Sequence, residues 1–184
     1  MNFDFKFEEI QKNWLINYLG LKDYNYIINE LKKVNVSTDI DYQRTFNSFY
    51  KIRRNEDWRK IYYSYFEENK YNKNLTFEDI IKYLYKKTKN VEASFSSKLL
   101  ATINPKMPIW DQYVIKNMNL NLIGKTKDEQ IQNAIDLYNK MVDECKNLLE
   151  REDVKKCIDK IKTLIDKYDV EDIKILDFIL WSIR

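Results

Sequence analysis

The sequence TKDEQIQNAIDLYNKMVDECKNLL, from Thr126 to Leu149, carries the most regular hydrophobic pattern of the chain. Its apolar side chains recur every three or four residues, which is the spacing of one face of an α-helix. They are Ile131, Ala134, Ile135, Tyr138, Met141, Val142, Cys145, Leu148 and Leu149. Thr126 and Glu129 have the spacing of a capping box, which marks the start of a helix. This segment therefore predicts a long amphipathic helix.

The same pattern resumes at Val154 and reaches Tyr168. One unbroken helix from Thr126 to Tyr168 would be about 60 Å long, which exceeds the size of a domain of this chain length. We therefore predict a break near Glu150–Asp153. Elsewhere the helical spacing recurs along nearly the whole chain, and no segment shows the alternation of a strand. The sequence predicts an all-α fold of about eight helices with a long C-terminal helical segment.

Two more helix ends can be read from local signals. Thr76 and Asp79 repeat the capping pattern, so a helix is predicted to begin there. Gly20 follows the apolar stripe of Ile10–Leu19, at the place where a left-handed helix stop would fall. These signals predict where helices begin and end before any tertiary contact is considered.

The length of the chain, 184 residues, favours a single all-α domain over residues 1–184. Within it, the polar stretch NKYNKNL at Asn69–Leu75 is the best candidate for a linker. Two lobes, residues 1–70 and residues 75–184, are therefore an alternative description of the same chain.

The composition excludes several classes of chemistry. The chain has no histidine, which rules out Ser-His-Asp and Cys-His catalysis and histidine-ligated zinc. Two glycines are too few for a glycine-rich phosphate loop. Cys145 and Cys157 have no further cysteine partners, so we predict reduced core residues and neither a metal nor another cofactor. The formal net charge of +3 permits a nucleic-acid partner without demanding one.

Neither a targeting signal nor a membrane span is predicted. Met1–Ile10 carries acidic side chains within its apolar stretch, unlike a secretory signal. Ile173–Ile183 is the most apolar stretch, yet it is too short to cross a bilayer and contains Lys174 and Asp177. It is predicted to be a terminal helix that docks on the core of a cytoplasmic protein with no membrane partner. Protein partners and the oligomeric state stay open.

A second segment, Ile80–Leu120, reads IIKYLYKKTKNVEASFSSKLLATINPKMPIWDQYVIKNMNL. It combines a helix, a tight turn, a second helix and a proline-bounded loop that ends in an aspartate. This order resembles the helix-hairpin-helix DNA glycosylase superfamily, whose pattern is L-P-G-V-G-x-K-T-A-x-x-h-L, a variable stretch, then P-h-D-x-x-V. Asn90-Val91-Glu92 stands at the place of Gly-Val-Gly. The run from Pro108 to Val114 matches the aspartate loop, with Trp110 as one extra residue.

The resemblance implies removal of a base from DNA, with Asp111 as the catalytic residue. Cleavage of an N-glycosidic bond builds positive charge on the sugar, and an ionised carboxylate beside C1′ stabilises that charge while it orients a water molecule. Trp110 and Tyr113 would contact the base that is flipped out of the duplex. Ser94 stands in the substrate site where bifunctional members carry a lysine nucleophile, so the resemblance implies a monofunctional enzyme.

The resemblance also implies contacts with the DNA backbone. In the family, hairpin glycines allow backbone N–H groups to approach a phosphate. Here Asn90 can adopt the left-handed conformation of a glycine, whereas Glu92 would place a negative charge beside the phosphate. The residues implied in binding nucleic acid are Lys86, Lys87, Lys89, Asn90, Arg53 and Arg54.

Two functions therefore stay open. One is a monofunctional N-glycosylase that acts on DNA through Asp111 and water, without a cofactor. The other is a non-catalytic helical module that keeps the fold and binds nucleic acid or a protein. In that case Asp111 is a plain N-cap worth about 1 kcal/mol, and Trp110 and Tyr113 belong to the core. An enzyme needs Asp111 in a cleft within reach of the hairpin, so the position of this residue separates the two.

Overall fold

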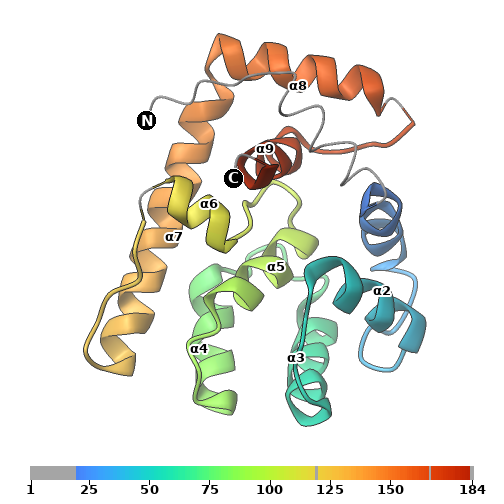
Figure 1. Ribbon diagram of the computed structural model, residues 1–184. Coiled ribbons are helices and arrows are strands. Elements are labelled where there is room, and N and C mark those ends of the chain that lie inside the picture. Colours follow the sequence, from blue (N-terminus) through green and yellow to red (C-terminus); the bar gives the residue numbers. More distant parts are fainter. Residues whose placement is uncertain (1–19, 119, 166, 183–184) are drawn as a thin grey trace.

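The computed structural model describes residues 20–118, 120–165 and 167–182, and within these ranges it contains helices and no strand (Figure 1). Residues 20–30 are helical. The helices that follow are α2 (Ile40–Tyr50), α3 (Glu56–Asn69), α4 (Phe77–Thr88), α5 (Ala93–Ile103), α6 (Gln112–Asn117), α7 (Lys127–Leu149), α8 (Glu152–Leu164) and α9 (Asp172–Ser182). The prediction of an all-α fold is confirmed.

The C-terminal helices follow the hydrophobic pattern that predicted them. α7 ends at Leu149 and α8 begins at Glu152, so the predicted break near Glu150–Asp153 is confirmed. Cys145 in α7 and Cys157 in α8 are buried free thiols, as expected of reduced core residues. In Figure 1, α7 runs along one side of the molecule, α8 lies across its end, and α9 packs against both.

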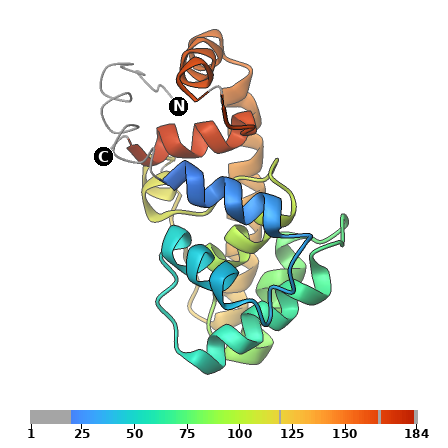
Figure 2. The same cartoon turned by 90° about the vertical axis from the view of Figure 1, so that its right-hand side faces the viewer.

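α9 is an inner helix of the bundle. Its fully buried side chains are Ile175, Leu176, Ile179 and Leu180. Figure 2 shows the helix of residues 20–30 beside it, and the Lys174 ammonium lies 5.2 Å from the ring centre of Tyr24 in that helix. Residues 173–180 of the predicted apolar stretch therefore dock on the core as expected, and residue 183 lies outside the described residues. In the described ranges, no helix has both the length and the apolar character needed to cross a bilayer.

Both capping boxes predicted from the sequence are present. Thr76–Asp79 and Thr126–Glu129 each form the two reciprocal hydrogen bonds of the motif. Gly20 differs from its prediction, because it is the first described residue of a helix that runs to residue 30, so it does not end a helix. The helix continues because the residues that follow, including Tyr24, bury apolar surface in the core. The apolar stripe predicted at Ile10–Leu19 lies outside the described residues.

Aromatic contacts join the helices on either side of the polar stretch Asn69–Leu75. Tyr65 of α3 and Tyr83 of α4 stack with their ring centres 3.8 Å apart. Phe77 of α4 stacks on Tyr138 of α7 at 4.0 Å. Such stacked pairs stabilise packing beyond the burial of their area. α4 is therefore held between α3 and α7, and this fixes the hairpin that α4 forms with α5.

Candidate functional site

A pocket of about 470 Å³ lies between the helix of residues 20–30, α2, α5, α9 and the loop that leads into α6. This volume is within the range of natural small-molecule sites. The charged side chains that line it include Lys98, Asp111, Lys174 and Asp177, and its aromatic side chains include Phe49, Phe95, Phe178 and Trp181. Asp111 therefore lines a pocket that also contains side chains from α5, the second hairpin helix.

The loop before Asp111 is fixed by hydrogen bonds to three different helices. The hydroxyl of Tyr138 in α7 donates to the carbonyl oxygen of Pro108 at 2.9 Å. The amide of Ile109 donates to Asp177 Oδ1 in α9 at 3.3 Å, and the amide of Trp110 donates to Ser97 Oγ in α5 at 2.9 Å. Such bonds from several elements hold a short loop in one conformation. The position of Asp111 is therefore set by tertiary structure as well as by the local sequence.

Asp111 serves as the N-cap of α6 and also lines the pocket. Its Oδ1 accepts a hydrogen bond from the amide of Tyr113 at 2.9 Å, and its backbone is extended, with φ −109° and ψ 149°. The side chain is partly exposed. The hydrogen bond of the cap thus uses one carboxylate oxygen of Asp111. The negative charge of the carboxylate contributes to the electrostatic potential in the pocket. Burial lowers the pKa of Lys98, and the negative charge of Asp111 opposes this shift.

Lys98 is a pocket residue that no sequence motif indicated. It lies one helical turn after Ser94 on α5, and residues at this spacing share a helix face. Its ammonium donates to the carbonyl oxygen of Tyr50 at 3.1 Å and lies 5.2 Å from the ring centre of Phe95. Burial lowers the pKa of Lys98, against the opposing charge of Asp111. Ser94 is half-buried and does not line this pocket.

Lys174 and Asp177 of α9 form the inner wall of the pocket, and the sequence analysis did not place them in a site. Each is only 6% exposed. Burial lowers the pKa of the Lys174 ammonium and raises the pKa of the Asp177 carboxyl, while the attraction between the two charges opposes both shifts. The spacing of these two residues on an apolar helix is the one sequence signal that marks them. Burial of a charged group is costly unless the group is paired and hydrogen-bonded.

The two aromatic residues predicted to contact a base are not among the residues that line this pocket. Trp110 is 8% exposed and stacks near Phe77, with ring centres 6.3 Å apart and planes inclined by 7°. Tyr113 meets the ring of Trp181 edge-on at 6.4 Å, and Trp181 itself lines the pocket. Phe95, rather than Trp110, supplies the aromatic surface beside Lys98.

The hairpin turn between α4 and α5 differs in one detail from its prediction. Lys89 adopts the left-handed conformation, with φ 61° and ψ 14°, where Asn90 was expected to do so. The amide of Asn90 instead donates to Thr88 Oγ1 at 3.3 Å. α5 has no side-chain cap at its N-terminus, so its first amides keep their capacity to bind an acceptor. Lys86 and Lys87 are exposed at the end of α4.

Glu92 does not face solvent beside the hairpin, contrary to the expectation from its place in the motif. It is 4% exposed, and its carboxylate is bound by one residue of the loop before α3 and by one residue of α3 itself. Arg54 donates to Glu92 Oε2 at 2.8 Å, and the indole N–H of Trp58 donates to Oε1 at 3.1 Å. Arg54 therefore neutralises Glu92. Arg53, Arg54 and Asn90 also line one surface pocket of about 380 Å³, so the structure brings these three predicted residues together.

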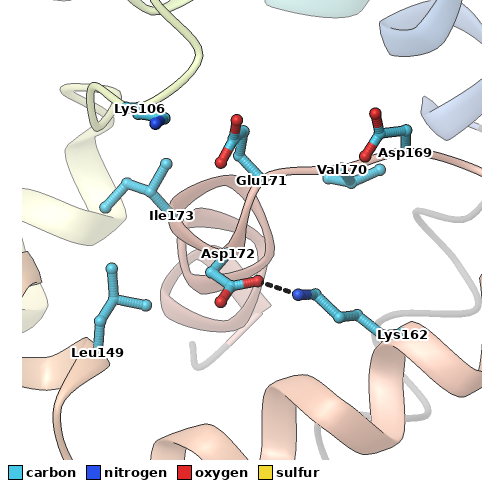
Figure 3. A pocket seen from close by; sticks show the side chains of 8 residues that line it. All are labelled: Lys106, Leu149, Lys162, Asp169, Val170, Glu171, Asp172 and Ile173. Carbon is cyan, nitrogen blue, oxygen red and sulfur yellow. Dashed lines mark ion pairs between the residues drawn. The ribbon is translucent and has the colours of Figure 1, made fainter.

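A second hollow, of about 410 Å³, lies at the start of α9 (Figure 3). Lys162 of α8 reaches toward Asp172 and forms an ion pair with it. Lys106 and Glu171 line the same hollow. All four of these charged side chains are exposed, so water solvates them. This hollow contains none of the residues predicted from the sequence, and it lacks the buried charges of the larger pocket.

Comparison of the chain with models of protein families, with curated proteins and with solved structures found no match.

Proposed function

We propose that the protein is a DNA N-glycosylase that removes a base flipped into the pocket beside Asp111. The observation that supports this function is the position of Asp111, which lines a pocket of about 470 Å³ together with side chains of the second hairpin helix. A carboxylate used only as a cap needs no such pocket. The aromatic side chains of the pocket provide flat apolar surface, which suits a planar ring.

In the proposed reaction, Asp111 stabilises the positive charge that develops on the sugar. The bond between C1′ and the base nitrogen breaks, and its electron pair leaves with the base. A water molecule, oriented by the carboxylate, forms the new bond to C1′, and the proton that it loses finally neutralises the departed base. A preorganised charge beside the reacting carbon acts most strongly in a site from which bulk water is excluded.

The same proposal assigns the hairpin to the DNA backbone. The uncapped N-terminus of α5 offers amide N–H groups and the positive end of a helix dipole, which together attract a phosphate. We expect Lys86, Lys87 and Lys89 at the end of α4, together with Arg53, to add positive charge to this contact. Arg54 acts indirectly, because its ion pair with Glu92 removes a negative charge from the neighbourhood of the phosphate.

Binding to a transition-state analogue tests this function without a guess at the base. A duplex that carries a cationic pyrrolidine abasic-site analogue imitates the charged sugar. We expect the wild-type chain to bind it at least about 100-fold more tightly than undamaged duplex. Both affinities should fall as salt rises, because phosphate contacts release counterions. Equal binding to the two duplexes would contradict the proposal and favour a non-catalytic module.

Lys98 supports a second candidate, a glycosylase that also cleaves the strand. Lys98 lies on the second hairpin helix, where bifunctional enzymes of the superfamily carry their lysine, and burial lowers its pKa toward the nucleophilic neutral amine. Its nitrogen would form a bond to C1′ as the bond to the base breaks and its electron pair leaves with the base, and the proton that the amine loses would neutralise the departed base. Opening of the sugar ring then gives an imine between Lys98 and C1′.

Reduction with borohydride distinguishes the two candidates. Hydride from this reagent converts the imine into a stable amine, so the protein becomes covalently attached to a duplex with an abasic site. If Lys98 is the nucleophile, we expect a covalent complex with the wild-type chain and none with Lys98→Met. Lys140→Met, at an exposed position of α7, is the matched control and should still be trapped. Absence of trapping in the wild-type chain would leave Asp111 and water as the proposed chemistry.

A further inference from the structure

Asp177 and Lys174 present hydrogen-bonding capacity that the protein does not use. Oδ1 of Asp177 accepts the amide of Ile109, but Oδ2 is buried and has no hydrogen-bond partner. A buried polar atom without a partner costs stability, so such an atom in a pocket calls for a ligand group that satisfies it. Oδ1 already accepts one hydrogen bond and Asp177 lines the pocket, so we assign Oδ2 as the acceptor for a ligand bound there.

The Lys174 ammonium is held by aromatic rings. It lies 4.7 Å from the ring centre of Phe178, 5.2 Å from that of Tyr24 and 5.4 Å from that of Phe49. Ring faces attract a cation, but they do not replace the oxygen acceptors that an ammonium group finds in water. In the described part of the chain, the contacts of this ammonium are with such rings. Its N–H donors therefore stay available to an acceptor in the pocket.

Together, Lys174 and Asp177 determine which hydrogen-bonding groups a ligand must present to the inner wall. Lys174 and Asp177 are three residues apart on α9, so they lie on the same helix face and both reach the pocket. The Lys174 ammonium is a donor only. Burial raises the pKa of Asp177 to about 7, and above that pH the carboxylate is ionised and its free oxygen is an acceptor only. A ligand that matches this pair has a hydrogen-bond acceptor next to a hydrogen-bond donor along one edge. A carbonyl oxygen next to a ring N–H, as in a lactam, provides this pair in one plane.

We propose that the pocket binds the lactam edge of a keto base, with Lys174 donating to the carbonyl oxygen and Asp177 Oδ2 accepting from the ring N–H. This inference rests on the proposed function, because it assigns the pocket to the base. It also fits the chemistry of departure. When the bond to C1′ breaks, the electron pair that leaves with a keto base is delocalised onto its carbonyl oxygen, beside a fixed ammonium group. A base that carries an amino group in place of this carbonyl group has no oxygen beside Lys174.

Calorimetric titration of the full chain with methylated bases tests the inference without DNA. 1-Methyluracil and 9-methylhypoxanthine have a lactam edge, whereas 1-methylcytosine and 9-methyladenine have similar size and no ring N–H. The methyl group stands in place of the sugar. We expect each lactam to bind about 10-fold or more tightly than its amino counterpart, because each lost hydrogen bond to a charged group costs about this factor. This comparison needs no variant. Equal affinities, or a preference for the amino bases, would overturn the inference.

Two variants test whether the preference for lactams over amino bases depends on Asp177 and Lys174, the inner wall of the pocket. Asp177→Asn keeps an oxygen for the Ile109 amide but places an NH₂ group where Oδ2 accepts, so the preference for lactams should disappear. Lys174→Met keeps the apolar stem and should weaken lactam binding about 10-fold. Asp172→Asn, on the same helix but in the hollow of Figure 3, is the matched control and should change neither affinity. A preference that survives in Asp177→Asn would overturn the assignment.

Failure of this inference can be told apart from failure of the proposed function. A wild-type chain that prefers lactams but does not recognise the pyrrolidine duplex has a base-binding pocket without glycosylase function. A chain that binds the pyrrolidine duplex selectively but has equal affinities for lactam and amino bases would support the glycosylase function and contradict the lactam inference. The two titrations use different ligands, so each outcome is read independently.

Discussion

Asp111→Asn is expected to lower the rate of base release by about 10²- to 10⁴-fold, the range found when a charged or proton-transferring catalytic group is removed. Asparagine retains a side-chain oxygen that accepts the amide of Tyr113, and asparagine is as good an N-cap as aspartate. The substitution therefore removes the charge that the proposed mechanism places beside C1′, and we expect it to leave the loop and α6 in place. Single-turnover release of a base, measured on the substrate found by screening, checks this result.

Asp39→Asn is the matched control for this prediction. Asp39 is the N-cap of α2, where it accepts the amide of Tyr42 at 2.8 Å, and it does not line the pocket. Both substitutions change one N-cap aspartate, so their effects on the melting temperature should be similar and small. Only Asp111→Asn should slow base release. Equal rates in the two variants would mean that Asp111 is a cap and has no part in catalysis.

The parts of the fold that the sequence predicted well depend on interactions between residues close in the chain. Thr126 and Glu129 form their capping box within one helical turn, and the break after Leu149 follows from the length of a single helix. The aspartate loop belongs to the same class, because a proline and an N-cap define it locally. Asp111 could therefore be singled out before any tertiary contact was known.

The inner wall of the pocket could not be predicted in this way. Asp177 contacts the Ile109 amide across 68 residues of sequence, and Lys174 owes its surroundings to rings on other helices. In the sequence these two residues indicate only that the segment does not cross a membrane. Glu92 shows the same limit, because its partner Arg54 lies 38 residues earlier.

Lys98 illustrates a different difficulty. Alignment by the hairpin turn selects Ser94 as the counterpart of the family's lysine, but the next position on the same helix face is Lys98. A shift of one helical turn keeps the direction of a side chain and moves it by about 5.4 Å along the axis. Periodicity therefore identifies the face of α5 that lines the pocket. Which helical turn of that face reaches the pocket depends on the tertiary structure.

The buried tyrosines predict that the fold is lost in mild alkali. Burial raises the pKa of Tyr24, Tyr42, Tyr50, Tyr62 and Tyr63 well above 10, and that of Tyr65 to about 12. In the unfolded chain a tyrosine ionises near pH 10, so above that pH the unfolded state binds fewer protons than the folded state. Stability is therefore fully present below about pH 10 and falls as the pH rises further.

The expected loss is large because several tyrosines act together. Each contributes about 1.4 kcal/mol per pH unit above pH 10, and the whole stability of a domain is about 5–15 kcal/mol. We expect cooperative loss of helix, measured by circular dichroism, between about pH 10 and pH 12, together with the appearance of tyrosinate absorbance. Gradual titration of the tyrosines in a chain that stays helical would contradict this.

Tyr42→Phe separates the proton linkage from other effects of alkali. The Tyr42 hydroxyl is buried without a hydrogen-bond partner, so its removal should not weaken the fold at neutral pH and is expected to raise the free energy of unfolding by about 1 kcal/mol. Above pH 10 the variant has one tyrosine fewer to ionise on unfolding, so its stability should fall less steeply by about 1.4 kcal/mol per pH unit. Urea titrations at several pH values measure both quantities. An unchanged dependence of the free energy of unfolding on pH would show that Tyr42 does not contribute to the alkaline transition. Deprotonation of the lysines would affect the wild-type chain and the variant alike, so it does not disturb the comparison.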